Sequence, residues 1–292
     1  MDCLNRGYLT AQMSRTVGVF FAATAALVAI APASAAVAKP SLNAAVIAGT
    51  HYGGSALYRG RGASPTLGLV VQPNGRVTAR AGLGIRCGGI NWNPVFVRMS
   101  GKASGPSFSV SGHTRLGSHT LRISAQGSAD GANANGTVRV RGRGCRGWKA
   151  PFTLRTESAV VGAPAMPPGK STFMGLQSQS AGGVRLPISL SVTHTGKVWG
   201  MWDVAMKCHG VTIPTANVTP YTKIRPDGSF TRTEHFKIRY RGGVVDHYNV
   251  KLAGQFRADG VSGTLRASVQ TKKPGHSYYP CYTGTQAWAA RR

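Results

Sequence analysis

Apolar and polar residues alternate along much of the chain, which is the pattern of β-strands that bury one face. Residues 137–141 (TVRVR) and 235–240 (HFKIRY) show this alternation over several positions. Turn signals such as 73–75 (PNG) and 226–228 (PDG) separate the alternating segments. Roughly seven or eight strands per half follow from this spacing. The sequence therefore predicts an all-β chain of β-sandwich or small β-barrel domains.

The first 38 residues depart from this pattern. An apolar run at 17–30 follows two arginines and precedes small residues, with Ala35 and Ala38 at sites suited to cleavage. This order is typical of a secretory signal peptide, and translation from Met13 would give a compact one. The run is short of the roughly 20 apolar residues of a membrane-spanning helix. We expect residues 1–38 to be removed on export and no transmembrane segment to remain.

The rest of the chain contains one pattern twice. Residues 67–87 (LGLVVQPNGRVTARAGLGIRC) and 188–208 (ISLSVTHTGKVWGMWDVAMKC) each hold an apolar strand, a turn glycine and a final cysteine. The glycine precedes the cysteine by 12 positions in both. A fixed order of features that recurs at long range indicates internal duplication. The predicted domains are a first β domain at 39–156 and a second at 171–292, related by that duplication.

A segment rich in proline joins the two predicted domains. Residues 157–170 (ESAVVGAPAMPPGK) contain three prolines, which break strands. Such a composition predicts a semi-rigid linker.

Four cysteines remain after the signal peptide, two in each half. Equivalent positions of a duplicated domain should pair alike, which predicts the disulfides Cys87–Cys145 and Cys208–Cys281. An exported chain reaches an oxidising compartment, where such bonds persist. A structural zinc site would need closely spaced ligand pairs, and the sequence has none. We expect no metal.

Each half also ends with a cysteine and a tryptophan motif, at 148–150 (WKA) and 288–290 (WAA). With the signal peptide and the duplicated block, these motifs resemble exported proteins of uncharacterised function from actinobacteria that are built from duplicated β domains. The resemblance covers the mature chain and implies its location and fold. It carries no active site.

Charge is the most unusual property of the composition. The 292 residues include 35 Lys and Arg against 8 Asp and Glu, a formal net charge of +27. A charge of this size favours an anionic partner. The partners we expect are wall phosphate polymers, acidic polysaccharide, anionic lipid or nucleic acid.

Two alternating segments place cations on one strand face. A solvated outer face explains the alternation, but it does not require every outward residue to be cationic. Arginine can make paired hydrogen bonds to phosphate or carboxylate. A binding surface would need these side chains on one continuous exposed patch. The candidate binding residues are Arg139, Arg141, Arg143, Lys237, Arg239 and Arg241.

Candidate chemistry is sparse, and no cofactor motif occurs. Of the seven carboxylates after the signal peptide, three precede glycine in turns and one lies in the linker. The remaining three, all in the second half, stand near histidines. Neighbouring strand residues point to opposite faces, so adjacent acid and histidine cannot act as one unit. The catalytic candidates are Asp203, Glu234, His235, Asp246 and His247.

Exposed aromatic side chains could add stacking to a binding site. Tryptophans that recur near the final cysteine of each half are instead expected to pack against the disulfides. The candidates for stacking are Trp92, Trp199, Trp202, Tyr278, Tyr279 and Tyr282.

Together these observations favour a secreted, non-enzymatic protein of the cell envelope or extracellular space that binds an anionic polymer or surface. One alternative is a secreted hydrolase with a site in the second half. Another is a structural envelope protein without a specific ligand.

Overall fold

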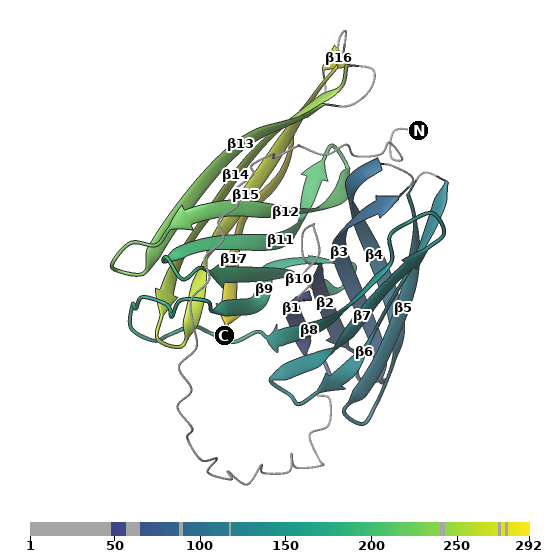
Figure 1. Ribbon diagram of the computed structural model, residues 1–292, viewed down its shortest axis with the longest axis horizontal. Helices are drawn as coiled ribbons and strands as arrows, with labels where there is room; N and C mark the ends of the chain where they lie inside the picture. Colours follow the sequence, from purple (N-terminus) through teal and green to yellow (C-terminus); the bar gives the residue numbers. More distant parts are fainter. Residues whose placement is uncertain are drawn as a thin grey trace, which may run out of the picture.

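The computed structural model shows two bodies of antiparallel β-sheet side by side, and no helix occurs among the residues it describes (Figure 1). The described residues are 48–56, 65–87, 90–116, 118–239, 243–273, 276–277 and 280–292. The predicted signal peptide lies outside them. In this part of the chain, no helix is long and apolar enough to cross a bilayer. The predicted all-β class is confirmed.

The first body is a closed barrel in which each strand pairs with the next along the chain. The last strand returns to the first, with Ser55 opposite Thr153. Its strands are β1 (His51–Ala56), β2 (Thr66–Val71), β3 (Arg76–Cys87), β4 (Ile90–Ser104), β5 (Ser107–Leu116), β6 (His119–Ala129), β7 (Asn133–Gly142) and β8 (Trp148–Thr156).

Apolar side chains at every second position of these strands fill the interior of the barrel. On β7, Val138 and Val140 are buried while Arg139 and Arg141 are exposed. Full burial of a valine, leucine or isoleucine side chain contributes roughly 1.5–3 kcal/mol. The apolar residues of all eight strands form one core cluster. The polar residues between them therefore face outward around the barrel.

The second body is a sheet with the strand order β12-β11-β10-β9-β17-β15-β14-β13, and β16 pairs with β15. Among the described strands, β12 and β13 stand at the two ends of this order. Its strands are β9 (Thr172–Ala181), β10 (Val184–Val192), β11 (Lys197–Cys208), β12 (Val211–Lys223), β13 (Ser229–Arg239), β14 (Val245–Arg257), β15 (Gly260–Lys273), β16 (His276–Ser277) and β17 (Cys281–Arg291).

One row of residues across the strands recurs in both bodies. The row contains two phenylalanine or tryptophan rings with a pair of glycines between them. A Cβ at Gly136 would lie 2.7 Å from the Phe152 ring, and one at Gly263 would lie 2.7 Å from the Trp288 ring. Glycine is therefore required at both positions for the aromatic ring to lie over the neighbouring strand. The rows are Phe108–Gly127–Gly136–Phe152 and Phe230–Gly254–Gly263–Trp288.

The sequence motifs match Trp148 with Trp288, but the row of residues across the strands gives a different match. Phe152, rather than Trp148, occupies the position that Trp288 has in the second body. Phe152 and Trp288 both follow their cysteine by seven positions. Trp148 is only partly buried against the barrel core. The common row supports internal duplication, which remains a prediction.

Both predicted disulfides are present. Cys87 bonds to Cys145 with an S–S distance of 2.07 Å, and Cys208 bonds to Cys281 at 2.14 Å. They close loops with sequence separations of 58 and 73 residues. Cross-links over such loops contribute about 4 kcal/mol each in the chain-entropy model. Two disulfides indicate an oxidising environment for the folded chain.

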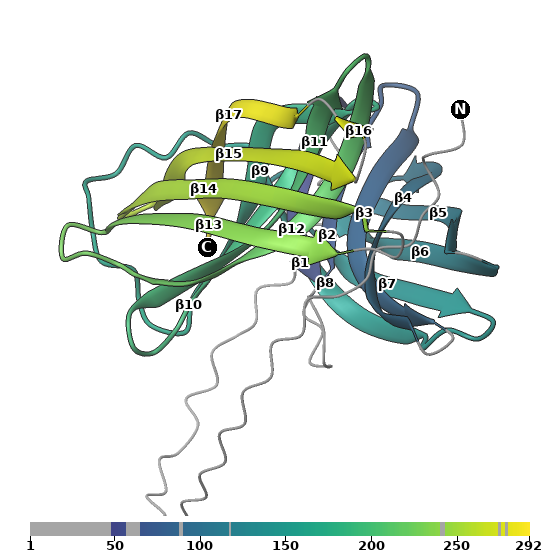
Figure 2. The same cartoon turned by 90° about the horizontal axis from the view of Figure 1, so that it is seen from above.

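The two bodies pack through the outer faces of β1 and β2 against β9 and β10, as the two views show (Figure 1 and Figure 2). A Cβ at Gly53 would lie 2.5 Å from the carbonyl oxygen of Gly175, so only glycine permits this approach. The Ser55 hydroxyl donates to the Ser189 hydroxyl across the contact at 3.1 Å. Most of β1 is buried, because the core lies on one face and the second body on the other.

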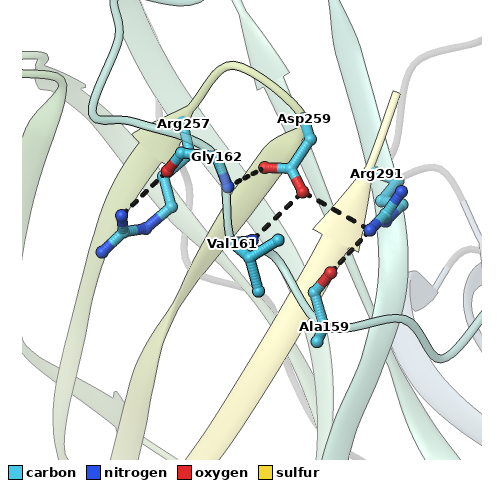
Figure 3. A network of polar contacts seen from close by, with 6 residues as sticks. All are labelled: Ala159, Val161, Gly162, Arg257, Asp259 and Arg291. Carbon is cyan, nitrogen blue, oxygen red and sulfur yellow. Dashed lines mark hydrogen bonds and ion pairs between the residues drawn. The ribbon is translucent and has the colours of Figure 1, made fainter.

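The segment between the bodies lies against the second sheet (Figure 3). Asp259, in the turn before β15, accepts hydrogen bonds from the backbone N–H groups of Val161 at 3.1 Å and Gly162 at 2.9 Å. Arg257 donates to the carbonyl oxygen of Gly162 and Arg291 to that of Ala159. The predicted linker is therefore fixed to the second body and does not serve as a spacer.

Candidate functional site

Basic side chains gather on the outer surface of the barrel over β5 to β8. We call this set the barrel basic face. All of its members are exposed, and each comes from an outward position of an alternating strand. Its members are His113, Arg122, Arg139, Arg141 and Lys149.

The pairing of the strands brings these charges together. Arg122 lies directly opposite Arg141 on β6 and β7, and Arg139 lies opposite Lys149 on β7 and β8. Side chains in such positions have Cβ atoms about 4.5–5.5 Å apart. Like charges at this separation repel. From β4 to β8 the chain has a single carboxylate, Asp130.

Asp130 does not neutralise this surface, because it belongs to the turn between β6 and β7. Its carboxylate accepts hydrogen bonds from the backbone N–H groups of Ala132 and Asn133 and from the Asn133 amide. Slight burial would raise the pKa of Asp130, but these hydrogen bonds outweigh it and lower the pKa.

Opposed like charges are general in this protein. Across the described strand pairs, six pairs of Lys or Arg face each other directly, and no Lys or Arg faces an Asp or Glu. Residue pairs across strands are the usual place for compensating charges. Their absence leaves these opposed basic side chains without a carboxylate directly across the strand pair. The six pairs are Arg76–Lys102, Arg80–Arg98, Arg122–Arg141, Arg139–Lys149, Lys197–Lys223 and Lys251–Arg266.

The two predicted arginine and lysine ladders lie on separate surfaces. Arg139 and Arg141 lie on β7 of the barrel, and Arg143 lies in the turn that follows β7. Lys237 and Arg239 are exposed on β13, in the other body (Figure 1). The ladders thus form two faces, and the single continuous patch expected from the sequence is not present in the described structure. A binding surface could then lie only within one body. Arg241 lies outside the described residues.

The face of β13 to β15 opposite the core of the second body is hollowed. One cavity of about 370 Å³ and a second of about 290 Å³ share His235, Asn249 and Ser268. Lys237 and His247 line the first cavity. Desolvation, with the charges of Lys237 and Lys272, lowers the pKa of His247.

The catalytic candidates are not brought together. Glu234 is paired with Arg232, and Asp246 accepts a hydrogen bond from the Thr271 hydroxyl at 2.6 Å. Both acids lie on the opposite sheet face from His235 and His247, as strand alternation requires. The histidines border a cavity whose described lining contains no carboxylate side chain.

Asp203 lies elsewhere, in the contact between the two bodies. It is 1% exposed, and a Cβ at Gly82 of the barrel would lie 2.5 Å from its Oδ1. Burial raises the pKa of Asp203 to about 7, although a hydrogen bond with Thr66 and the charge of Arg80 act in the opposite direction. The sequence gives no sign that Asp203 is buried between the two bodies, because this contact forms between strands that are distant in the chain.

The geometry at Thr66 is consistent with a protonated Asp203. The Thr66 Oγ1 atom lies 2.6 Å from Asp203 Oδ1 and 3.1 Å from the carbonyl oxygen of Gly82. One hydroxyl hydrogen can serve only one of these acceptors. A protonated Asp203 would donate to Thr66, which would then donate to Gly82, so both contacts would be hydrogen bonds. This arrangement suits a structural group better than a catalytic base.

The aromatic candidates divide between core and surface. Trp202 is buried and donates to the Thr219 hydroxyl at 2.8 Å. Trp199 and Tyr221 form an edge-to-face pair at 6.2 Å between ring centroids, and Tyr221 is exposed. Tyr282 is also exposed, beside Ser268. The side chains of Trp92, Tyr278 and Tyr279 lie outside the described part of the structure.

No family model, curated protein or solved structure matches this chain. The resemblance to exported actinobacterial proteins therefore stays a prediction. Among the residues that the structure describes, no group of three His, Cys, Asp or Glu side chains is placed to hold a metal ion. The basic surfaces are the candidate binding sites of the described structure.

Proposed function

We propose that this protein is a secreted, non-enzymatic component of the cell envelope or extracellular space that binds an anionic polymer through the barrel basic face. The observation that carries the proposal is the pair of opposed contacts Arg122–Arg141 and Arg139–Lys149 on adjacent strands. Wall phosphate polymers, acidic polysaccharides, anionic lipid surfaces and nucleic acids all present the required charge.

Opposed like charges cost stability in the free protein. Cross-strand charge pairs change stability by roughly 0.2–1 kcal/mol, and like charges act unfavourably. An anionic polymer placed over Arg139 and Arg141 would turn this repulsion into attraction. Arginine is suited to the task because its planar group forms paired hydrogen bonds with phosphate or carboxylate.

Protection of a sheet edge is the main competing explanation for charged strands. It suits β13, which stands at one end of the second sheet and carries Lys237 and Arg239. It does not suit β7, because the barrel is closed and β7 pairs on both sides. The charges on β7 therefore support a binding role more strongly than those on β13.

Export is supported by two independent features. The first 38 residues have the order of a signal peptide. The disulfides Cys87–Cys145 and Cys208–Cys281 require an oxidising compartment to persist. An exported polycation would meet anionic wall and matrix polymers first.

The test is retention of the full oxidised chain on heparin, on wall material rich in phosphate polymer, and on neutral dextran across a salt gradient. We expect retention on the two anionic supports alone, weakening with salt because exposed charges are screened. The double variant Arg139→Gln with Arg141→Gln should elute at clearly lower salt.

The matched control is Arg76→Gln with Lys102→Gln. This pair is also opposed and exposed, and it lies on β3 and β4, three to four strands around the barrel from β7. It removes the same charge and should shift elution less. Equal shifts for both double variants would show that only net charge matters, and equal retention on dextran would exclude an electrostatic ligand.

A further inference from the structure

The hollowed face of β13, β14 and β15 has a pattern of charge that a general polyanion surface would not need. Two adjoining cavities of about 370 and 290 Å³ form one groove, with His235, Asn249 and Ser268 in both. We call this the sheet groove. Its floor is the outer face of three neighbouring strands, and Pro280 also lines the first cavity.

Lysine and arginine side chains stand at the two ends of the sheet groove, and no lysine or arginine of the described lining lies between them. Lys251 faces Arg266 at one end, and Lys237 faces His247 at the other. The residues at these two ends are four positions apart along β14, which corresponds to about 13 Å. No carboxylate side chain lines either cavity in the described structure.

The middle of the sheet groove carries hydrogen-bonding groups. His235 faces Asn249, which faces Ser268, and Tyr282 follows in the same row on β17. Asn249 offers both donors and an acceptor, and a serine hydroxyl can do the same. Tyr282 is 54% exposed and stands opposite Ser268. Sugar hydroxyls and ring faces match these groups.

We propose that the sheet groove binds an acidic polysaccharide that carries one anionic group per disaccharide. This inference rests on the proposed function and gives it a ligand class and a second surface. An extended disaccharide brings consecutive acidic groups to the two cationic ends and leaves the neutral sugar over Asn249 and Ser268.

Denser polyanions fit this pattern less well. A nucleic acid duplex strand carries one phosphate per 3.4 Å of its axis, roughly a quarter of the spacing between the cationic ends. A polysaccharide with an acid on every ring also places a charge over Asn249, away from Lys251 and Lys237. The groove is therefore expected to select by charge spacing.

The experiment compares three probes by calorimetry with the full oxidised chain at one fixed salt concentration. Hyaluronan oligosaccharides carry one carboxylate per disaccharide, polygalacturonate oligomers carry one per ring, and polyphosphate carries one charge per phosphate. We expect hyaluronan to bind the sheet groove most tightly. Lys251→Gln with Arg266→Gln should weaken hyaluronan binding at least tenfold.

Two further variants separate recognition from charge. Arg76→Gln with Lys102→Gln removes the same charge from another opposed pair and should change hyaluronan affinity less than threefold. Asn249→Leu alters a single exposed, neutral residue of the groove. It should weaken hyaluronan binding several-fold and leave polyphosphate binding unchanged.

Different results would contradict binding at the sheet groove and binding at the barrel basic face. Tighter binding of polygalacturonate or polyphosphate, or equal effects of the Lys251 and Arg76 double variants, would overturn the groove assignment. If Arg139→Gln with Arg141→Gln still weakened retention on heparin, the proposed function would survive that result. Absence of binding to every anionic probe would reject both.

Discussion

Replacing Asp203 with asparagine tests the contact between the two bodies. The Asp203 carboxyl is buried beside Thr66 and Gly82 of the barrel, and its Oδ2 has no hydrogen-bond partner among the described residues. An isolated carboxylate in such a place is unfavourable, so the neutral acid is the stable form. Asparagine has nearly the same shape and is neutral at every pH.

The magnitude follows from the pKa. Burial raises the pKa of Asp203 from 3.8 to about 7, so between these values the folded state holds a proton that the unfolded state has lost. Stability then falls with rising pH by about 1.4 kcal/mol per unit. The stabilising proton is fully present below pH 4 and is lost as pH rises through 7. The total change is about 4 kcal/mol.

The assay is urea unfolding of the oxidised chain, followed by tryptophan fluorescence between pH 4 and pH 8. The wild type should lose stability over this range, whereas Asp203→Asn should lose much less and exceed the wild type at pH 8. Asp130→Asn is the control, because the pKa of Asp130 is lowered and its carboxyl titrates below the range. Equal slopes for wild type and Asp203→Asn would show that Asp203 does not hold this proton in the folded state.

Three other changes test the fold. Arg122→Gln with Arg141→Gln should raise stability by a few tenths of a kcal/mol in low salt, because an opposed like-charge pair is removed, and added salt should abolish the difference in thermal melts. Replacing Cys208 and Cys281 with serine should cost about 4 kcal/mol in urea unfolding, and an unchanged midpoint would contradict the chain-entropy account. Asp259→Asn should weaken the attachment of the segment that joins the bodies and speed its cleavage by protease. In the wild type, hydrogen bonds from the segment keep the pKa of Asp259 low, so cleavage should speed up only in acid.

Much of the fold could be predicted because the relevant information is local. Alternation at residues 137–141 places Val138 in the core and Arg139 outside, and the barrel follows that pattern. The repeat of a turn glycine 12 positions before a cysteine also led to the disulfide pairing. The pairing could be predicted from equivalent positions in the two halves, without knowing how the strands are arranged in space.

The candidate site was predicted only in part. The sequence identifies Arg139 and Arg141 as outward residues, but Arg122 and Lys149 join them only through strand pairing. Alternation assigns a side chain to a face and leaves its neighbours on other strands undefined. For the same reason the sequence could not show that the ladders of the two predicted domains lie on separate surfaces.

The strands, the inward and outward residues, the disulfide pairs and the excess of positive charge follow from the amino-acid sequence alone, because each depends on composition or on short-range order. Tertiary structure alone decided which cations oppose one another, where the sheet groove lies, and that Asp203 is enclosed between the bodies. These features depend on strand register and on the contact between β1 and β2 and β9 and β10. Strand register is fixed by closure of the barrel. The contact between the bodies is made by residues more than a hundred positions apart, and glycines on β1 allow the close approach.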